Sequence, residues 1–182
     1  MGLQNYPERH GAVTFKGSPV TLVGAELKVG DHAPDFELIS NDMSGIQLKD
    51  LLADNTRAAL LIVVPSIDTS VCSLETVKFN RHVAALPTDK IATFTVSVDL
   101  PFAQKRWCSS EKVANLSLLS AYRDHKFGAE YGVLIKELGL LARAVFLIDK
   151  DGIIRLSYVV PEVAQEPDYD QVLDESRKLI GV

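Results

Sequence analysis

The chain is 182 residues long, with 47% hydrophobic and 24% charged residues, a composition that indicates a globular domain rather than a disordered chain. Lysine and arginine number 19 against 24 aspartates and glutamates, so the formal net charge of −5 argues against a nucleic-acid or anionic-lipid partner. No apolar run approaches the roughly 18 residues that cross a bilayer, and no export signal is visible. We therefore expect a soluble cytoplasmic protein with no nucleic-acid and no membrane partner.

The first half of the chain alternates strand and helix patterns. Apolar and polar residues alternate around a glycine-containing turn at 16–19, which predicts a hairpin. A continuous apolar run over 59–64 is typical of a strand buried on both faces of a sheet. The expected elements are strands over 13–15, 20–23, 36–39, 46–48 and 59–64, a short helix capped by Asp50, and a helix over 71–86.

The second half continues the alternation and ends in a hairpin and a helix. Pro101 favours the start of a helix, and the Asp-Gly turn within 149–152 predicts a connection between two strands. The expected elements are strands over 91–98, 116–119, 142–148 and 153–160, a helical turn or two over 102–107, a short helix over 126–131, and an amphipathic helix over 168–180.

This order of elements predicts an α/β fold of the thioredoxin-like kind. It would have a mixed central β-sheet flanked by helices and an N-terminal β-hairpin extension. We find no internal repeat and no linker. The chain is therefore interpreted as one domain over 13–182, preceded by a frayed N-terminal stretch over 1–12.

The two cysteines, Cys72 and Cys108, lie too far apart in the sequence for a Cys-x-x-Cys redox motif or a zinc knuckle. A structural disulfide is improbable in a reducing cytosol. Three interpretations stay open on this ground: two inert buried thiols, one reactive thiol with a bystander, or a transient catalytic pair.

Cys72 falls in the first turn of the expected 71–86 helix, where unpaired amides and the helix dipole favour negative charge. Asp68 and Glu75 would act against a thiolate if they faced the sulfur. Thr69 is placed either to cap the helix or to bind a species held at the sulfur. Spacing alone does not decide between these roles.

Three separated segments resemble the thiol peroxidase branch of the peroxiredoxins. The run from Pro65 to Cys72 reads Pro-Ser-Ile-Asp-Thr-Ser-Val-Cys, similar to the Pro-x-x-x-Thr-x-x-Cys signature of that family. The run from Asp99 to Cys108 reads Asp-Leu-Pro-Phe-Ala-Gln-Lys-Arg-Trp-Cys, with Trp107 in place of the usual Phe. Two C-terminal segments, Leu-Ala-Arg-Ala at 141–144 and Glu-Pro-Asp-Tyr at 166–169, complete the resemblance, which covers the chain from about Val13 to Leu179.

The resemblance implies a thiol-specific peroxidase that reduces hydrogen peroxide and organic hydroperoxides. Cys72 would be the peroxidatic cysteine and would be oxidised to sulfenic acid. Thr69 would orient the peroxide, and Arg143 would stabilise the thiolate and the leaving oxygen. Pro65 would close the pocket over Cys72 and remove a competing backbone donor.

The resemblance also implies a second half-reaction and two partners. Cys108 would be the resolving cysteine and would form an intramolecular disulfide with Cys72, which thioredoxin would then reduce. The family implies a homodimer. No metal or organic cofactor is expected, and because the cysteines belong to different helices, we expect local rearrangement before they join.

Two rival functions remain from the residues. A cysteine hydrolase would need a histidine base, but His82 lies nearly three turns along the helix from Cys72. A redox sensor would share every thiol feature and differ only in turnover. The four histidines are scattered without the short spacing of a zinc site.

Overall fold

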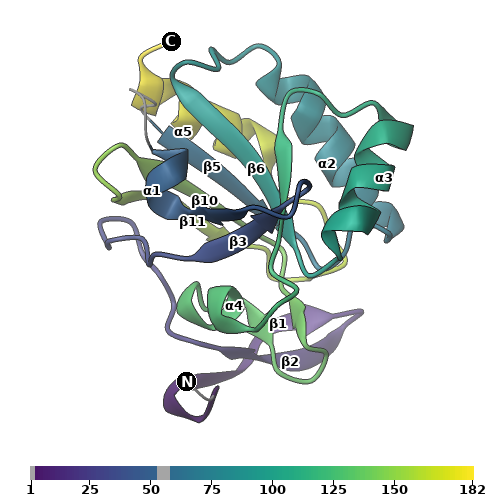
Figure 1. Cartoon of the computed structure of the whole chain (residues 1–182). Coiled ribbons are helices and arrows are strands. Elements are labelled where there is room, and N and C mark those ends of the chain that lie inside the picture. Colours follow the sequence, from purple (N-terminus) through teal and green to yellow (C-terminus); the bar gives the residue numbers. More distant parts are fainter. Residues whose placement is uncertain (1–2, 53–57) are drawn as a thin grey trace.

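The computed structural model describes residues 3–52 and 58–182 as two β-sheets with helices packed on them (Figure 1). The strands are β1 Glu8–Phe15, β2 Ser18–Val23, β3 Glu37–Ser40, β4 Gly45–Gln47, β5 Ala58–Val63, β6 Ile91–Ser97, β7 Ser117–Ser120, β8 Leu134–Ile135, β9 Leu140–Leu141, β10 Ala144–Asp149 and β11 Ile154–Val159. The helices are α1 Leu48–Leu51, α2 Ser70–Val83, α3 Pro101–Glu111, α4 Lys126–Glu130 and α5 Tyr169–Ile180, with a 3-10 turn at Leu3–Asn5.

The main sheet has the strand order β11-β10-β5-β6-β7-β3-β4. β5, β6 and β7 run parallel, whereas β10 and β3 pair antiparallel with their neighbours in this core. Every residue of β5 is buried, as its apolar run predicts. The mixed sheet of the expected α/β fold is therefore confirmed.

Alternate residues of β5 serve two hydrophobic cores. Leu60 and Ile62 pack with residues of α2, α3 and α5. Leu61 and Val63 pack on the opposite face with the N-terminal hairpin, α1 and α4. Because side chains of a strand alternate between faces, this one strand joins both halves of the fold.

The N-terminal hairpin is part of a second sheet that the sequence did not predict. Its strand order is β1-β2-β8-β9, and β8 pairs with β2 through Leu22 and Ile135. β8 and β9 contain two residues each, too few to show a period. The sheet makes the hairpin an integral layer of the domain.

Residues 8–12, which the sequence analysis placed in a frayed stretch, belong to β1. The Arg9 side chain holds this end of the strand, because its Nε donates to the Gly24 carbonyl at 2.9 Å and its Nη2 donates to the Gly132 carbonyl. A register shift between Arg9 and Val13 breaks the alternation of side chains. That irregularity hides the strand from pattern analysis.

Helix α3 extends to Glu111, beyond the end expected at Trp107. The added turn carries two serines whose hydroxyls donate to the carbonyls of Lys105 and Trp107, so it has no apolar period to reveal it. The helix ends at Lys112, which adopts the left-handed conformation with φ 55°. Cys108 therefore lies inside the last turn of α3 and not after it.

Glu162 joins the N-terminal hairpin to the loop between β11 and α5. Its carboxylate accepts hydrogen bonds from the Lys16 and Gly17 amides at 2.9 Å each, and from the Thr14 hydroxyl and Ala164 amide at 2.8 Å each. These bonds, led by that of Ala164, lower the pKa of Glu162 to about 2. The carboxylate thus stays ionised at this joint over most of the pH range.

We predict that Glu162→Gln destabilises the protein at neutral pH and that the difference shrinks in acid. A carboxylate whose pKa is lowered in the folded state stabilises above its unfolded pKa, and this contribution is lost as the pH falls through the folded value. Urea unfolding midpoints at about pH 7 and about pH 3 measure the difference. Glu175→Gln, on the exposed surface of α5, is the matched control and should shift neither midpoint. An equal destabilisation by Glu162→Gln at both pH values would contradict the assignment.

Candidate active site

The site is built on the first turn of α2, where Thr69 is the N-cap residue. The Thr69 hydroxyl accepts a hydrogen bond from the Cys72 amide at 3.4 Å and donates one to the Ser66 carbonyl at 3.1 Å. Cys72 is the third residue of the helix, and only 1% of its surface is exposed. Cys72 therefore lies at the N-terminal end of the helix, where the free amides and the helix dipole favour negative charge.

Arg143 brings a buried positive charge to the same sulfur. Its guanidinium donates from Nη2 to the Cys72 Sγ at 3.3 Å, from Nη1 to the Glu75 carboxylate, and from Nε to the Val163 carbonyl at 3.0 Å. The arginine is 1% exposed. All three nitrogens of the fork are used, so the guanidinium is held in one orientation against the thiol.

The register of the central sheet explains why Arg143 reaches Cys72. β10 pairs with β5 so that Ala144 lies opposite Val63, the last residue of β5. Arg143 directly precedes β10, and the chain leaving β5 runs through Pro65 to the loop before α2. The arginine and the cysteine are thus brought to one edge of the sheet by strand pairing.

Glu75, one helical turn after Cys72, faces the arginine and is fully buried. Burial raises the pKa of Glu75 to about 7, against the opposing effect of Arg143. Its Oε1 has no hydrogen-bond partner among the described residues. From the sequence, Glu75 was expected only as a charge opposed to the thiolate, whereas its i, i+3 spacing from Cys72 also permits both residues to contact Arg143.

Asp99 holds the loop that precedes α2. Its carboxylate accepts hydrogen bonds from the Ser66 hydroxyl at 2.7 Å, the Ile67 amide at 2.8 Å and the Ser97 hydroxyl at 2.6 Å. Asp99 follows β6, the parallel neighbour of β5, so both loops leave the same edge of the sheet. In the sequence Asp99 stands in a motif without an assigned role, and its place after a buried strand is the signal that could have revealed one.

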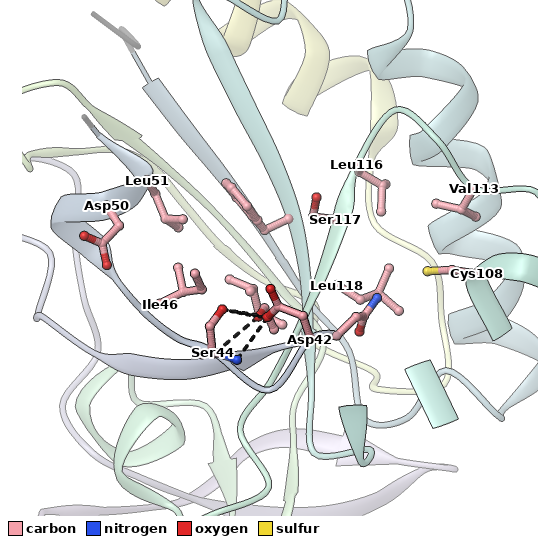
Figure 2. Close-up of a pocket in the computed structure, with 14 residues that line it drawn as sticks. Asp42, Ser44, Ile46, Asp50, Leu51, Cys108, Val113, Leu116, Ser117 and Leu118 are labelled. Atoms are coloured by element: carbon pink, nitrogen blue, oxygen red, sulfur yellow. Dashed lines mark hydrogen bonds between the residues drawn. The ribbon is translucent and has the colours of Figure 1, made fainter. Parts of the chain in front are cut away.

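Cys108 forms no disulfide with Cys72 in the structure, and both cysteines are free thiols. It lines a cavity of about 490 Å³ together with Asn41, Val113 and Leu118, and Figure 2 shows its sulfur turned toward this cavity. Burial raises the pKa of the Cys108 thiol, while a hydrogen bond with Asn41 opposes this effect. The structure therefore joins Thr69, Cys72 and Arg143 by hydrogen bonds, and Cys108 lines a separate cavity.

The two cysteine-bearing helices are nevertheless directly linked. The indole N–H of Trp107 donates to the Ser73 hydroxyl at 3.2 Å, and the two residues are the chain neighbours of Cys108 and Cys72. In Figure 1, α2 and α3 lie side by side. Trp107 is thus positioned to sense a change in either helix.

The family of the chain is shown by its similarity to known proteins. The Redoxin family matches residues 28–173, which is most of the chain. The chain belongs to the Redoxin family. The thiol peroxidase of Listeria monocytogenes is 48% identical over 166 residues, which cover 91% of this chain and 98% of that protein. The thiol peroxidase of Bacillus subtilis is 42% identical over 168 residues, which cover 92% of this chain and 98% of that protein.

Two solved structures are similar to this Redoxin family member. A peroxiredoxin-like protein from Aquifex aeolicus has a TM-score of 0.85 and 42% identity, with coverage of 94% of this chain and 99% of that one. A thiol peroxidase from Chromobacterium violaceum has a TM-score of 0.81 at 22% identity, with coverage of 91% and 95%, and supports the fold alone. The predicted thioredoxin-like fold and the resemblance to thiol peroxidases are confirmed.

His82 and Pro65 are the remaining candidate residues of this Redoxin family member. The His82 ring lies beside that of Tyr169 in a tilted arrangement, with ring centroids 5.6 Å apart. The unbroken α2 holds His82 roughly 15 Å along the helix from Cys72, so it cannot be the base that a cysteine hydrolase would need. Pro65 is buried two residues after β5.

In residues 3–52 and 58–182, no group of three or more His, Cys, Asp or Glu side chains is placed to hold a metal ion. No helix in the described part of the chain is long and apolar enough to cross a membrane.

We predict that Asp99→Asn lowers both stability and reactivity. An amide offers one acceptor oxygen where the carboxylate offers two, and a lost hydrogen bond to a charged group costs about 1.5–3 kcal/mol. The loosened loop should slow oxidation of Cys72 by about tenfold or more. Thermal unfolding and the rate of Cys72 oxidation by peroxide are the measurements.

Asp68→Asn, on the exposed side of the same loop, is the control for this change. It should leave both quantities near their wild-type values. If Asp99→Asn kept the wild-type rate and stability, Asp99 would have no part in holding the loop.

Proposed function

We propose that the protein is a peroxidase that reduces hydrogen peroxide and organic hydroperoxides through Cys72 and Cys108. The contact of the buried Arg143 guanidinium with the Cys72 sulfur, 3.3 Å from Nη2, carries this proposal. A cation aimed at a thiol favours its ionised, nucleophilic form. The family of the chain and its thiol peroxidase relatives support the same chemistry.

In the first half-reaction the Cys72 thiolate attacks one oxygen of the peroxide. A sulfur–oxygen bond forms, the oxygen–oxygen bond breaks, and the leaving oxygen takes a proton to become water or an alcohol. The sulfur loses two electrons and becomes sulfenic acid. Arg143 stabilises the thiolate and then the negative charge that develops on the leaving oxygen.

Thr69 and Pro65 are assigned to substrate placement. The exposed Thr69 hydroxyl lies beside the first turn of α2, where it can hydrogen-bond a peroxide at the sulfur. Pro65 has no amide hydrogen, so it does not compete for the substrate oxygens, and its rigid ring would shape the wall over Cys72.

In the second half-reaction the Cys108 thiol attacks the sulfenic sulfur of Cys72. A disulfide forms and water leaves, after which an external dithiol, which we assign to thioredoxin, reduces the disulfide. Cys72 and Cys108 belong to different helices, and we expect α2, α3 or both to unwind locally before the sulfurs meet. We assign this activity to a cytoplasmic homodimer.

We predict different defects for the two cysteine variants. Cys72→Ser should abolish peroxide reduction, because a hydroxyl is not a comparable nucleophile at neutral pH. Cys108→Ser should consume about one equivalent of peroxide and then stop, because Cys72 sulfenic acid is left unresolved. Steady turnover with thioredoxin and the mass of Cys72 after peroxide treatment measure these outcomes.

The fluorescence of Trp107 follows the same two steps in time. Wild-type protein should show one change in fluorescence on oxidation of Cys72 and a second on disulfide closure, and Cys108→Ser should lose the second.

Unmodified Cys72 in peroxide-treated Cys108→Ser would overturn the peroxidatic assignment. Wild-type protein that forms the disulfide without turnover would identify a sensor instead of an enzyme.

A further inference from the structure

A buried carboxyl group that the proposed mechanism does not use lies against the reactive centre. Glu75 is 0% exposed and contacts Nη1 of Arg143, while the neighbouring Nη2 contacts Cys72. Its other oxygen, Oε1, has no hydrogen-bond partner among the described residues. One cation therefore faces two acids, each of which becomes an anion when it ionises.

A second anion is costly in this setting. A buried charge is tolerated when it is paired and fully hydrogen-bonded, and Arg143 supplies a single positive charge. If Cys72 and Glu75 were both ionised, the buried group would carry a net negative charge. If one of them keeps a proton, the group is neutral.

The charged groups on the neighbouring elements make a second anion beside Arg143 still more costly. Glu166, in the loop before α5, adds negative charge near Glu75. Lys78 of α2 binds the Glu166 carboxylate at 2.7 Å, and the Tyr169 hydroxyl of α5 donates to it as well. Lys78 is thus already paired with Glu166, and Arg143 is the cation that contacts Glu75.

We propose that Cys72 and Glu75 share a single proton beside Arg143, so that Cys72 ionises by giving its proton to Glu75. The S–H bond of Cys72 breaks, an O–H bond forms on Glu75, and the net charge of the buried group does not change. The inference rests on the proposed function, because it concerns how Cys72 becomes a thiolate. The raised pKa of Glu75, about 7, is consistent with a carboxyl that holds a proton near neutrality.

This arrangement fixes the proton balance of the first half-reaction. Once Cys72 becomes an uncharged sulfenic acid, Arg143 has no other anion, and Glu75 ionises to pair with it. The proton that Glu75 releases equals the proton that the leaving oxygen takes up. When the disulfide is later reduced, Cys72 returns as a thiol and can protonate Glu75 again.

The test counts protons during oxidation of reduced Cys108→Ser protein, which stops at sulfenic acid. One equivalent of hydrogen peroxide is added in weak buffer with a pH indicator at neutral pH. We expect no net proton uptake from the medium. The Cys108→Ser, Glu75→Gln double variant should take up about one proton from the medium per Cys72 oxidised, because glutamine cannot supply a proton. The thiolate absorbance of this variant, measured before peroxide is added, verifies that its Cys72 is ionised. Uptake of one proton by Cys108→Ser itself would overturn the proposal.

An infrared difference spectrum gives a second readout that needs no change at Glu75. Oxidation of Cys108→Ser should remove the band of a protonated carboxyl group and add that of a carboxylate. Adding Glu175→Gln, a matched change at a carboxylate on the outer side of α5, should alter neither the band nor the proton count. A spectrum without loss of a protonated carboxyl would refute the shared proton. In each experiment the mass of Cys72 reports sulfenic acid separately, so a failure of the peroxidase function is distinguishable from a failure of this inference.

Discussion

The arrangement of this protein depends on one buried cation. Arg143 is out of contact with water, and an arginine in that position must satisfy its charge and its N–H groups from within the protein. The thiol of Cys72, the carboxylate of Glu75 and the carbonyl of Val163 do so. Two of these partners come from α2 and the third from the loop before α5, so the guanidinium joins the catalytic helix to the C-terminal part of the fold.

The Val163 carbonyl is itself held by the N-terminal hairpin. The Val163 amide donates to the Thr14 carbonyl at 2.8 Å, and Thr14 donates its own amide to the Pro161 carbonyl at 2.8 Å. Glu162 binds the hairpin turn between these two contacts. A hairpin far from Cys72 in the sequence therefore supports the orientation of Arg143, and the small sheet anchors that hairpin to the domain.

Much of this could be predicted from the sequence because it depends on local pattern. The strand β5 is visible as a continuous apolar run and the helix α5 as an apolar periodicity, and Thr69, Cys72 and Arg143 stand out through motifs. The two-residue strands β8 and β9 have no periodicity, and the last turn of α3 is polar. Such elements form because neighbouring strands and side-chain hydrogen bonds complete them, which is tertiary information.

The same distinction applies to the site. Glu75 and Asp99 are visible in the sequence as acidic residues, but the groups that they contact lie on other elements. Whether Glu75 opposes the thiolate or binds its cation depends on the register that aligns Ala144 with Val63. Whether Asp99 is a motif residue or a loop anchor depends on the parallel pairing of β5 and β6. Pairing between distant strands cannot be deduced from spacing along the chain.

The most direct measurement is the rate of Cys72 oxidation in Arg143→Ala compared with Arg143→Lys, together with the thiolate absorbance of each reduced protein. Loss of a charge-assisted hydrogen bond worth about 1.5–3 kcal/mol corresponds to about a 10- to 100-fold slower reaction. Arg143→Ala should show that loss and less thiolate at neutral pH, and Arg143→Lys should retain part of both. Combining Arg143→Ala with Glu75→Gln guards against misfolding from an unpaired buried carboxylate. An Arg143→Ala protein with the wild-type oxidation rate and the wild-type thiolate absorbance would contradict the central role of this cation.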